Sequence, residues 1–157
     1  GCYNQFRKRA SLSSSSLSIV SELKSGSAWY VPGGCSTIGR LFNDACGRYA
    51  FAGDKHSGSI PLAFETVFDK AGDADVWTIK YNRDRDMTYS DLKADYIGYT
   101  GFKAFKTRNI YGCNTAKVPF YEETPFRPDY LLSDLIQILH PEIGDLGGLR
   151  YFCKLNE

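Results

Sequence analysis

The sequence predicts an α/β domain built around a largely parallel sheet, and three observations lead to this prediction. Apolar runs typical of strands alternate with segments of helical periodicity along most of the chain. The stretch over residues 111–142 reads as a buried strand, an aromatic loop and a capped amphipathic helix in succession. The chain has 157 residues, 43% of them apolar, which suits one domain that buries about two-thirds of its unfolded surface.

Short runs rich in β-branched and aromatic residues mark the expected strands. They cover residues 17–23, 29–31, 49–52, 75–81, 109–113 and 151–155. Ser36 is a suitable N-cap for a helix, and a further helix over residues 64–71 has one apolar face. Residues 89–106 are expected to form one or two more helices. The last helix begins at Pro128, where no amide donor is needed, and stops before Pro141.

The chain divides into three segments of different character. Residues 1–10 look like the polar end of a helix whose earlier turns lie outside the sequence. Residues 11–18, SLSSSSLS, form a serine-rich connector of the kind usually found in flexible linkers. From residue 19 to residue 157 the pattern is continuously that of a globular α/β unit.

Composition excludes several classes of protein. Nineteen basic and eighteen acidic residues leave a net charge of +1, so we expect no nucleic-acid partner, since such proteins usually show a basic excess. No run approaches the roughly 20 apolar residues of a membrane span. The five cysteines and two histidines lack the spacing of a zinc site or a dense disulfide framework. We therefore expect no metal site and no intrinsic cofactor.

In an open parallel sheet, ligands bind at the carboxyl ends of the strands, where loops leave for the following helices. This rule selects four loops, which cover residues 33–36, 53–60, 81–87 and 114–126. They are rich in Gly, Tyr, Phe and small polar residues, which suits a large, flat, partly apolar ligand. The candidate ligand contacts are Trp29, Tyr30, Ser59, Ile60, Tyr81, Phe120, Tyr121 and Arg127.

A packing role is the alternative for each aromatic residue among these candidates, because any α/β domain of this composition buries several rings. Phe120 and Tyr121 are the stronger candidates for contact. They precede Glu122, Glu123 and Pro125 in a segment too polar for a core, so at least one ring should face the opening.

The motif GGCST at residues 33–37 offers an enzymatic alternative, because two glycines before Cys35 at a helix start resemble an anion nest or an activated thiol. A catalytic cysteine needs a base and an orienting group, and His56 has no identifiable third partner. The motif also lacks the lysine of a phosphate-binding loop. We expect no catalytic residue and no enzymatic activity.

Three segments carry a resemblance to a known family: AWYVPGG at residues 28–34, FETVFDKAGDADVWTI at 64–79, and the stretch over 111–142. Together they resemble the carboxyl-terminal lobe of the class III substrate-binding proteins of ABC importers, which capture cobalamin or ferric siderophores. The resemblance spans nearly the whole chain. It implies a three-layer sandwich with a mostly parallel central sheet, forming one lobe of a two-lobe protein, with residues 1–10 as the end of an inter-lobe helix.

The resemblance also assigns roles to particular residues. Phe120 and Tyr121 match an aromatic pair that borders the cleft in cobalamin binders, whereas Ser59 and Ile60 stand where that group has a tryptophan. Glu65 matches a glutamate that reaches arginines of the membrane permease. The alternative for Glu65 is stabilisation by the helix dipole, commonly about 0.3–1 kcal/mol, without any partner.

Two functions of different classes follow. The first is the solute-binding component of an ABC importer, which captures a cobalamin, ferric siderophore or haem-type ligand between two lobes and docks to a permease and ATPase pair. Such a protein is periplasmic or at the cell surface, where a lipid anchor can hold it. The second is a stand-alone α/β domain that binds a ligand or a protein without transport. An isolated lobe exposes its cleft face, so self-association is also expected.

Overall fold

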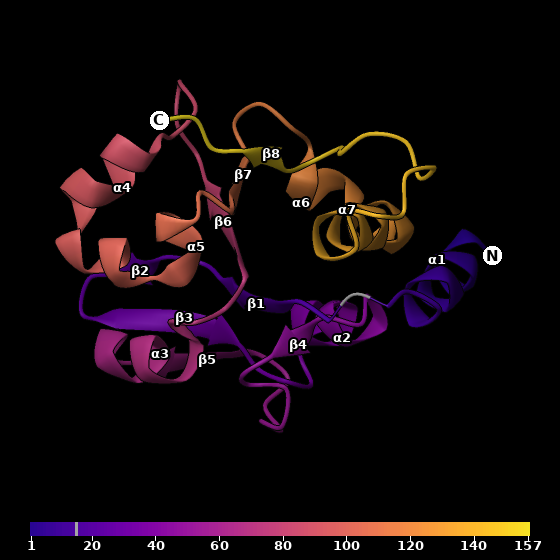
Figure 1. Cartoon of the computed structure of the whole chain (residues 1–157), viewed down its shortest axis with the longest axis horizontal. Helices are drawn as coiled ribbons and strands as arrows, with labels where there is room; N and C mark the ends of the chain where they lie inside the picture. Colours follow the sequence, from indigo (N-terminus) through magenta and orange to yellow (C-terminus); the bar gives the residue numbers. More distant parts are fainter. Residues whose placement is uncertain (15) are drawn as a thin grey trace.

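The computed structural model describes residues 1–14 and 16–157. It has three layers, with a five-stranded sheet between two layers of helices (Figure 1). Ser15, which belongs to the expected serine-rich connector, lies outside the described residues. The strand order is β4-β1-β6-β7-β8. Their bounds are β1 Ser18–Ser21, β4 Arg48–Tyr49, β6 Val76–Tyr81, β7 Ile110–Asn114 and β8 Cys153–Lys154. All neighbours are parallel except β8, so the mostly parallel sheet is confirmed.

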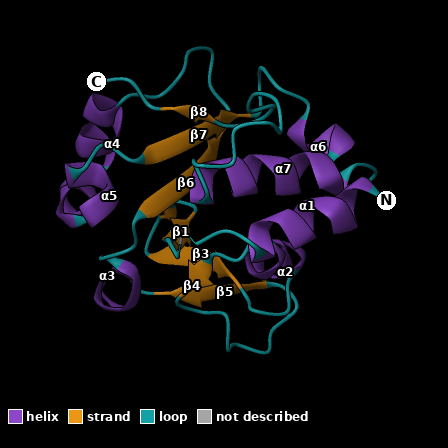
Figure 2. Ribbon diagram, turned by 45° about the vertical axis from the view of Figure 1, so that its right-hand side comes forward, coloured by secondary structure: helices purple, strands orange, loops and turns teal. Residues whose placement is uncertain are grey.

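Helices cover both faces of this sheet (Figure 2). One face carries α2 Thr37–Asp44, α6 Phe120–Glu123 and α7 Pro128–Leu139. A fourth helix, α1 Cys2–Ser11, packs on α7. The other face carries α3 Phe64–Ala71, α4 Tyr89–Asp95, the 3-10 helix η1 Ile97–Gly101 and α5 Lys103–Lys106. Local signals explain several ends: the Ser36 side chain accepts a hydrogen bond from the Gly39 N–H at 3.0 Å, and Pro128 occupies the first turn of α7.

A second, antiparallel sheet corrects two expectations. It has the order β2-β3-β5, with bounds β2 Lys24–Ser25, β3 Ala28–Pro32 and β5 Ser59–Leu62. The strand expected at residues 29–31 thus pairs outside the central sheet, and residues 59–60, expected in a loop, lie in a strand. The cause lies in two left-handed positions, φ +75° at Glu22 and φ +61° at Gly26, which turn the chain back on itself after β1.

Successive side chains along β6 point to opposite faces of the central sheet. Trp77 points to the side of the second sheet, where its ring lies 5.8 Å from that of Trp29 and 4.9 Å from that of Phe102. Thr78 and Lys80 point to the opposite side, towards α2 and α7. Trp29 is fully buried, and its Nε1 donates to the Ser21 carbonyl at 3.0 Å. The aromatic pairs add about 0.5–1.5 kcal/mol each beyond area burial.

A buried carboxylate on α7 holds the chain that leads into β8. Asp134 is 1% exposed and accepts hydrogen bonds from the backbone N–H groups of Arg150 at 2.8 Å, Tyr151 at 2.8 Å and Phe152 at 3.1 Å. Burial raises the pKa of Asp134, while the three N–H donors favour its charged form. This contact fixes the last segment of the fold against α7.

Replacement of Asp134 by alanine should lower the free energy of unfolding by about 2 kcal/mol or more at acidic pH, because at least two buried N–H groups lose their acceptor. The control is Asp95→Ala, which removes an exposed ion pair with Arg83 and should cost less than about 1 kcal/mol. Urea titrations measure both. Equal losses for the two variants would contradict this account of Asp134.

The difference in stability between the native chain and Asp134→Ala should depend on pH. Because burial raises the folded-state pKa of Asp134, its stabilising contribution is complete below the unfolded-state pKa and declines as the pH rises through the folded-state pKa. The gap in stability between the native chain and Asp134→Ala should therefore narrow as the pH rises over that range. A gap that widens would contradict the raised pKa.

Candidate functional site

The parallel strands β1, β6 and β7 end at the same edge of the central sheet. Ser21 pairs with Thr78, three residues before the end of β6, and Tyr81 pairs with Asn114, the last residue of β7. Residue 22 follows directly on β1, and the segments over 82–88 and 115–119 follow on β6 and β7. This edge is the position at which open α/β sheets bind ligands.

Lys80 is the charged centre of the edge. Its Nζ lies 3.1 Å from Glu22 Oε1, 5.1 Å from the centroid of the Phe120 ring and 5.9 Å from that of Tyr121. The side chains of Lys80 and Glu22 are only 20% and 23% exposed, so solvent screens this ion pair incompletely. A cation is thus held between a carboxylate and two aromatic rings.

The two rings of α6 have different surroundings. Phe120 is buried, and its ring centroid lies 5.5 Å from that of Tyr151. Tyr121 is 61% exposed and meets Phe120 edge to face at 5.2 Å. Phe120 therefore packs in the core, and Tyr121 offers a free aromatic surface beside Lys80.

Two arginines flank Tyr130 next to α6. The Cζ atoms of Arg127 and Arg150 each lie 3.8 Å from the centroid of the Tyr130 ring. Arg127 also forms a bidentate pair with Asp129, through Nε–Oδ1 at 3.0 Å and Nη2–Oδ2 at 2.8 Å, which lowers the pKa of Asp129. Arg150 lies 3.8 Å from Glu123 on α6. Half-exposed guanidinium groups on an aromatic ring suit flat or anionic ligand groups.

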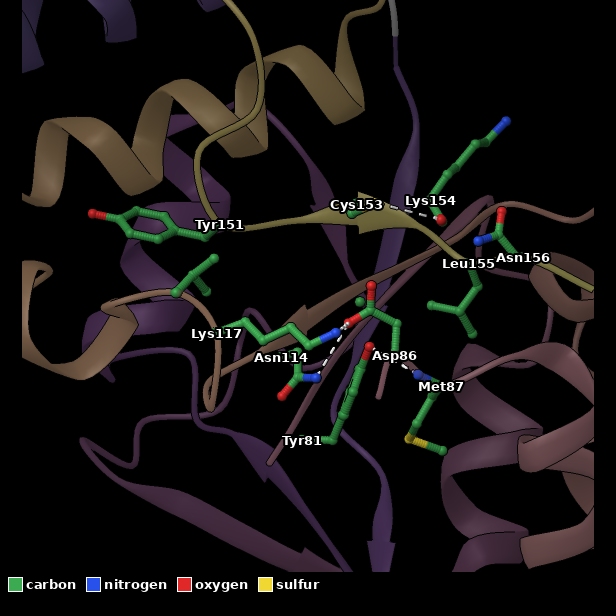
Figure 3. A pocket seen from close by; sticks show the side chains of 12 residues that line it. Tyr81, Asp86, Met87, Asn114, Lys117, Tyr151, Cys153, Lys154, Leu155 and Asn156 are labelled. Atoms are coloured by element: carbon green, nitrogen blue, oxygen red, sulfur yellow. Dashed lines mark hydrogen bonds and ion pairs between the residues drawn. The ribbon is translucent and has the colours of Figure 1, made fainter. Parts of the chain in front are cut away.

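A hollow of about 170 Å³ opens beside the ends of β6 and β7 (Figure 3). Asn114 and Lys117 both reach the Asp86 carboxylate, at 3.2 Å and 3.3 Å. Asn114 also exchanges hydrogen bonds with the backbone of Arg83, so it ties the two loops together. Gly112 keeps the floor open, because a Cβ there would lie 2.8 Å from Leu155 Cδ1 and 3.0 Å from Tyr81 Cε1.

The structure separates the candidate residues into groups. Phe120, Tyr121 and Arg127 lie in the contiguous region around α6 and the start of α7. Tyr81 lines the hollow, and its hydroxyl accepts from the Met87 N–H at 3.0 Å. Trp29 has no exposed surface for a ligand and packs in the core.

The remaining candidates lie in the second sheet. Tyr30 is 49% exposed on β3 and pairs with Pro61, on the side of the strand away from the buried Trp29. Ser59 and Ile60 pair with Pro32 and Val31, so they are parts of a strand rather than of a loop. Within the described part of the chain, these three residues take no part in the ion pair or the ring contacts of Lys80.

Sequence reasoning missed Glu22, Lys80, Asn114 and Arg150. A lysine inside the apolar run VWTIKY was a usable signal for Lys80, since a strand buried on both faces seldom carries a charge without a partner. Glu22 and Arg150 join the site through contacts distant in sequence, for which no local pattern exists.

The glycine pair of the GGCST motif has a structural role. A Cβ on Gly33 would lie 2.3 Å from the His56 carbonyl oxygen, and one on Gly34 would lie 2.2 Å from that of Ala52. The backbone N–H groups of Gly33 and Cys35 donate to the carbonyls of Gly58 and His56. These donors hold the crossing segment of residues 52–58, which accounts for the glycines without an anion.

Comparison with known proteins identifies the family. Residues 6–116 match the family model described as periplasmic binding protein, so the chain belongs to this family. Among curated proteins, an uncharacterized lipoprotein of Methanocaldococcus jannaschii is 31% identical over 128 residues. The match covers 81% of this chain but only 30% of that protein, so the chain spans less than a third of the relative's length.

Solved structures share the fold. A TroA-like periplasmic binding protein, FepB, from Veillonella parvula matches with a TM-score of 0.67 at 14% identity, over 99% of this chain and 53% of its own. S. aureus IsdE complexed with heme matches with a TM-score of 0.61 at 16% identity, over 88% of this chain and 53% of its own. Within the described residues, no helix has the length and apolar character needed to cross a membrane.

Replacement of Asn114 by alanine should raise the pKa of Asp86, because the hydrogen bond from the Asn114 side chain is the largest single cause that lowers it. Lys117→Met removes a hydrogen bond and a positive charge beside Asp86, and it should raise the pKa as well. Titration of the Asp86 carboxyl carbon by NMR measures both. An unchanged Asp86 pKa in Asn114→Ala would contradict the role given to Asn114.

Proposed function

We propose that the chain is one lobe of a solute-binding protein of an ABC importer, and that the edge around Lys80 and Tyr121 contacts the solute. The observation that carries this proposal is a cation and an exposed ring at the carboxyl ends of the parallel strands. Membership of the periplasmic binding protein family supports it.

The solute class we propose is a large metal chelate: a ferric siderophore, a haem-type ligand or a cobalamin. Tyr121, Tyr130 and the guanidinium groups of Arg127 and Arg150 provide flat surfaces and positive charge over a short stretch. One similar structure is described as complexed with heme, and another as an ABC-type Fe3+-hydroxamate transport system, which agrees with this class.

A second lobe should complete the cleft. The chain covers 53% of the TroA-like structure, and a ligand-binding site normally buries most of its ligand's surface. Tyr121 beside Lys80 is 61% exposed, so we propose that this edge forms one wall only. We propose that α1 belongs to the connection between the lobes, and that the longer protein lies outside the cytoplasm with a lipid anchor, as expected for relatives of a lipoprotein.

Glu65 is the proposed contact to the permease. It lies exposed in the first turn of α3, whose N-cap residue, Ala63, has no side-chain hydrogen bond. Within the described part of the chain, Glu65 makes no ion pair of 4.0 Å or less with a basic side chain. A carboxylate available in this way can pair bidentately with an arginine of a partner protein.

Removal of the exposed ring should weaken solute binding. In the longer two-lobe protein, Tyr121→Ala should reduce affinity about tenfold, which corresponds to about 1.4 kcal/mol. Fluorescence titration against cobalamin, ferric siderophores and haem measures the affinity. The control is Ile97→Ala, which removes a similarly exposed apolar side chain on the opposite face. Binding of no panel member, or equal effects of the two substitutions, would contradict the proposed site.

Removal of the Glu65 charge should impair delivery without changing capture. We expect Glu65→Gln to reduce uptake by membranes that contain the permease, with an unchanged dissociation constant for the solute, because Glu65 lies on α3 and Lys80 on the other face of the sheet. Asp69→Asn, on the same helix, is the charge-matched control. Normal uptake with Glu65→Gln would remove Glu65 from the docking contact.

A further inference from the structure

A small cavity lies beneath the Lys80–Glu22 ion pair, on the α2 and α7 side of the central sheet. Its volume is about 20 Å³. Ser21, Glu22, Thr78 and Lys80 form its polar part, and apolar side chains of α2, α6 and α7 together with Phe152 form the rest. The cavity therefore connects the buried interior of the sheet with the candidate solute edge.

Ser21 is the unusual member of this lining. It is 2% exposed, and its Oγ makes no hydrogen bond within the described part of the chain. Ser21 and Thr78 are direct neighbours in the parallel pair of β1 and β6, so their side chains point to the same face. A buried hydroxyl without a partner loses its hydration with no compensation, and such groups are rare in native proteins.

The size and the polar lining of the cavity both suit a bound water molecule. A water molecule needs a cavity of at least about 10–15 Å³ and two to four polar partners. The volume of about 20 Å³ satisfies the first condition. The hydroxyls of Ser21 and Thr78, together with the Glu22 carboxylate and the Lys80 ammonium, satisfy the second.

We propose that this cavity binds one water molecule, which accepts or donates a hydrogen bond at Ser21 Oγ and links it to the Glu22–Lys80 pair. Ser21 is then a positioning residue: it acts on Lys80 through the water. The backbone of Glu22 is already fixed, because its carbonyl accepts from Trp77 Nε1 at 2.9 Å and its N–H donates to the Thr78 carbonyl at 2.9 Å. The water would hold the side-chain end of the same residue.

This proposal does not depend on the proposed transport function. It rests on an unpaired buried hydroxyl and a cavity of matching size, and both exist whatever solute the edge binds. Its failure would leave the solute site untouched, and failure to find a solute would leave the water site untouched.

The change in stability caused by Ser21→Ala shows whether the cavity is hydrated or dry, because the two cases give changes of opposite sign. If the water is present, the substitution removes one of its partners, and the urea midpoint should fall by about 0.5 M. If the hydroxyl is unpaired, the substitution removes an uncompensated polar group, and the midpoint should rise. A rise, or no change, would overturn the proposal.

A crystal structure at atomic resolution supplies the direct observation. We expect one ordered water within hydrogen-bond distance of Ser21 Oγ in the native chain, and none in Ser21→Val, whose added methyl groups fill the cavity. Absence of the water from the native chain would overturn the proposal. The structure of the native chain tests the proposal without any substitution, so it also covers the case in which Ser21→Ala fails to fold.

A separate measurement tests whether Ser21 helps to position Lys80. Proton exchange of the Lys80 ammonium, followed by nitrogen-15 NMR, should become several-fold faster in Ser21→Ala, because the ion pair loses its link to the cavity. Lys103, which pairs with Asp75 and lies on α5 at the other face of the sheet, serves as the internal control and should not change. Unchanged exchange at Lys80 would show that Ser21 has only a structural role.

Discussion

The parallel pairing of β6 with β1 on one side and β7 on the other is the constraint on which the rest of the structure depends. It brings the ends of three strands to one edge and sends Trp77 to one face and Lys80 to the other. A slip of one residue in β6 would exchange these faces, burying Lys80 among the rings of the second sheet and turning Trp77 towards α7. The aromatic cluster around Trp77 therefore sets the position of Lys80 at the candidate site.

Much of this arrangement follows from local sequence signals. The alternation of strand-like and helical runs predicted the α/β class, and the amphipathic pattern between Pro128 and Pro141 predicted α7, although its first residue has no side-chain cap. Two elements could not be predicted in this way. The segment SIPL forms β5 only because Tyr30 and Pro61 come together in a register that depends on the whole second sheet. The burial of Trp29 likewise arises from contacts with Trp77 and Phe102, which are distant in sequence.

The sequence predicted the approximate position of the candidate site but not the charged residues that form it. The sequence indicated the correct loop for Tyr121, because a polar, proline-containing segment cannot enter the core. It gave no sign that Glu22 and Arg150 would meet Lys80 and α6, since those contacts need the finished sheet and the anchor of Asp134. Lys80, Arg127 and Arg150 each have an acidic neighbour, so a solute that binds these cations must compete with an existing ion pair. Such a site gains affinity chiefly from enclosure by a second wall.

The most direct test of a solute-binding edge is hydrogen–deuterium exchange on the proposed two-lobe protein, with and without the solute that the panel identifies. We predict slower exchange at residues 22–23, 80–83 and 120–124, because the solute would shield the ends of β1 and β6 and helix α6. Protection confined to α3, α4 and the second sheet, with no change at those three segments, would contradict it.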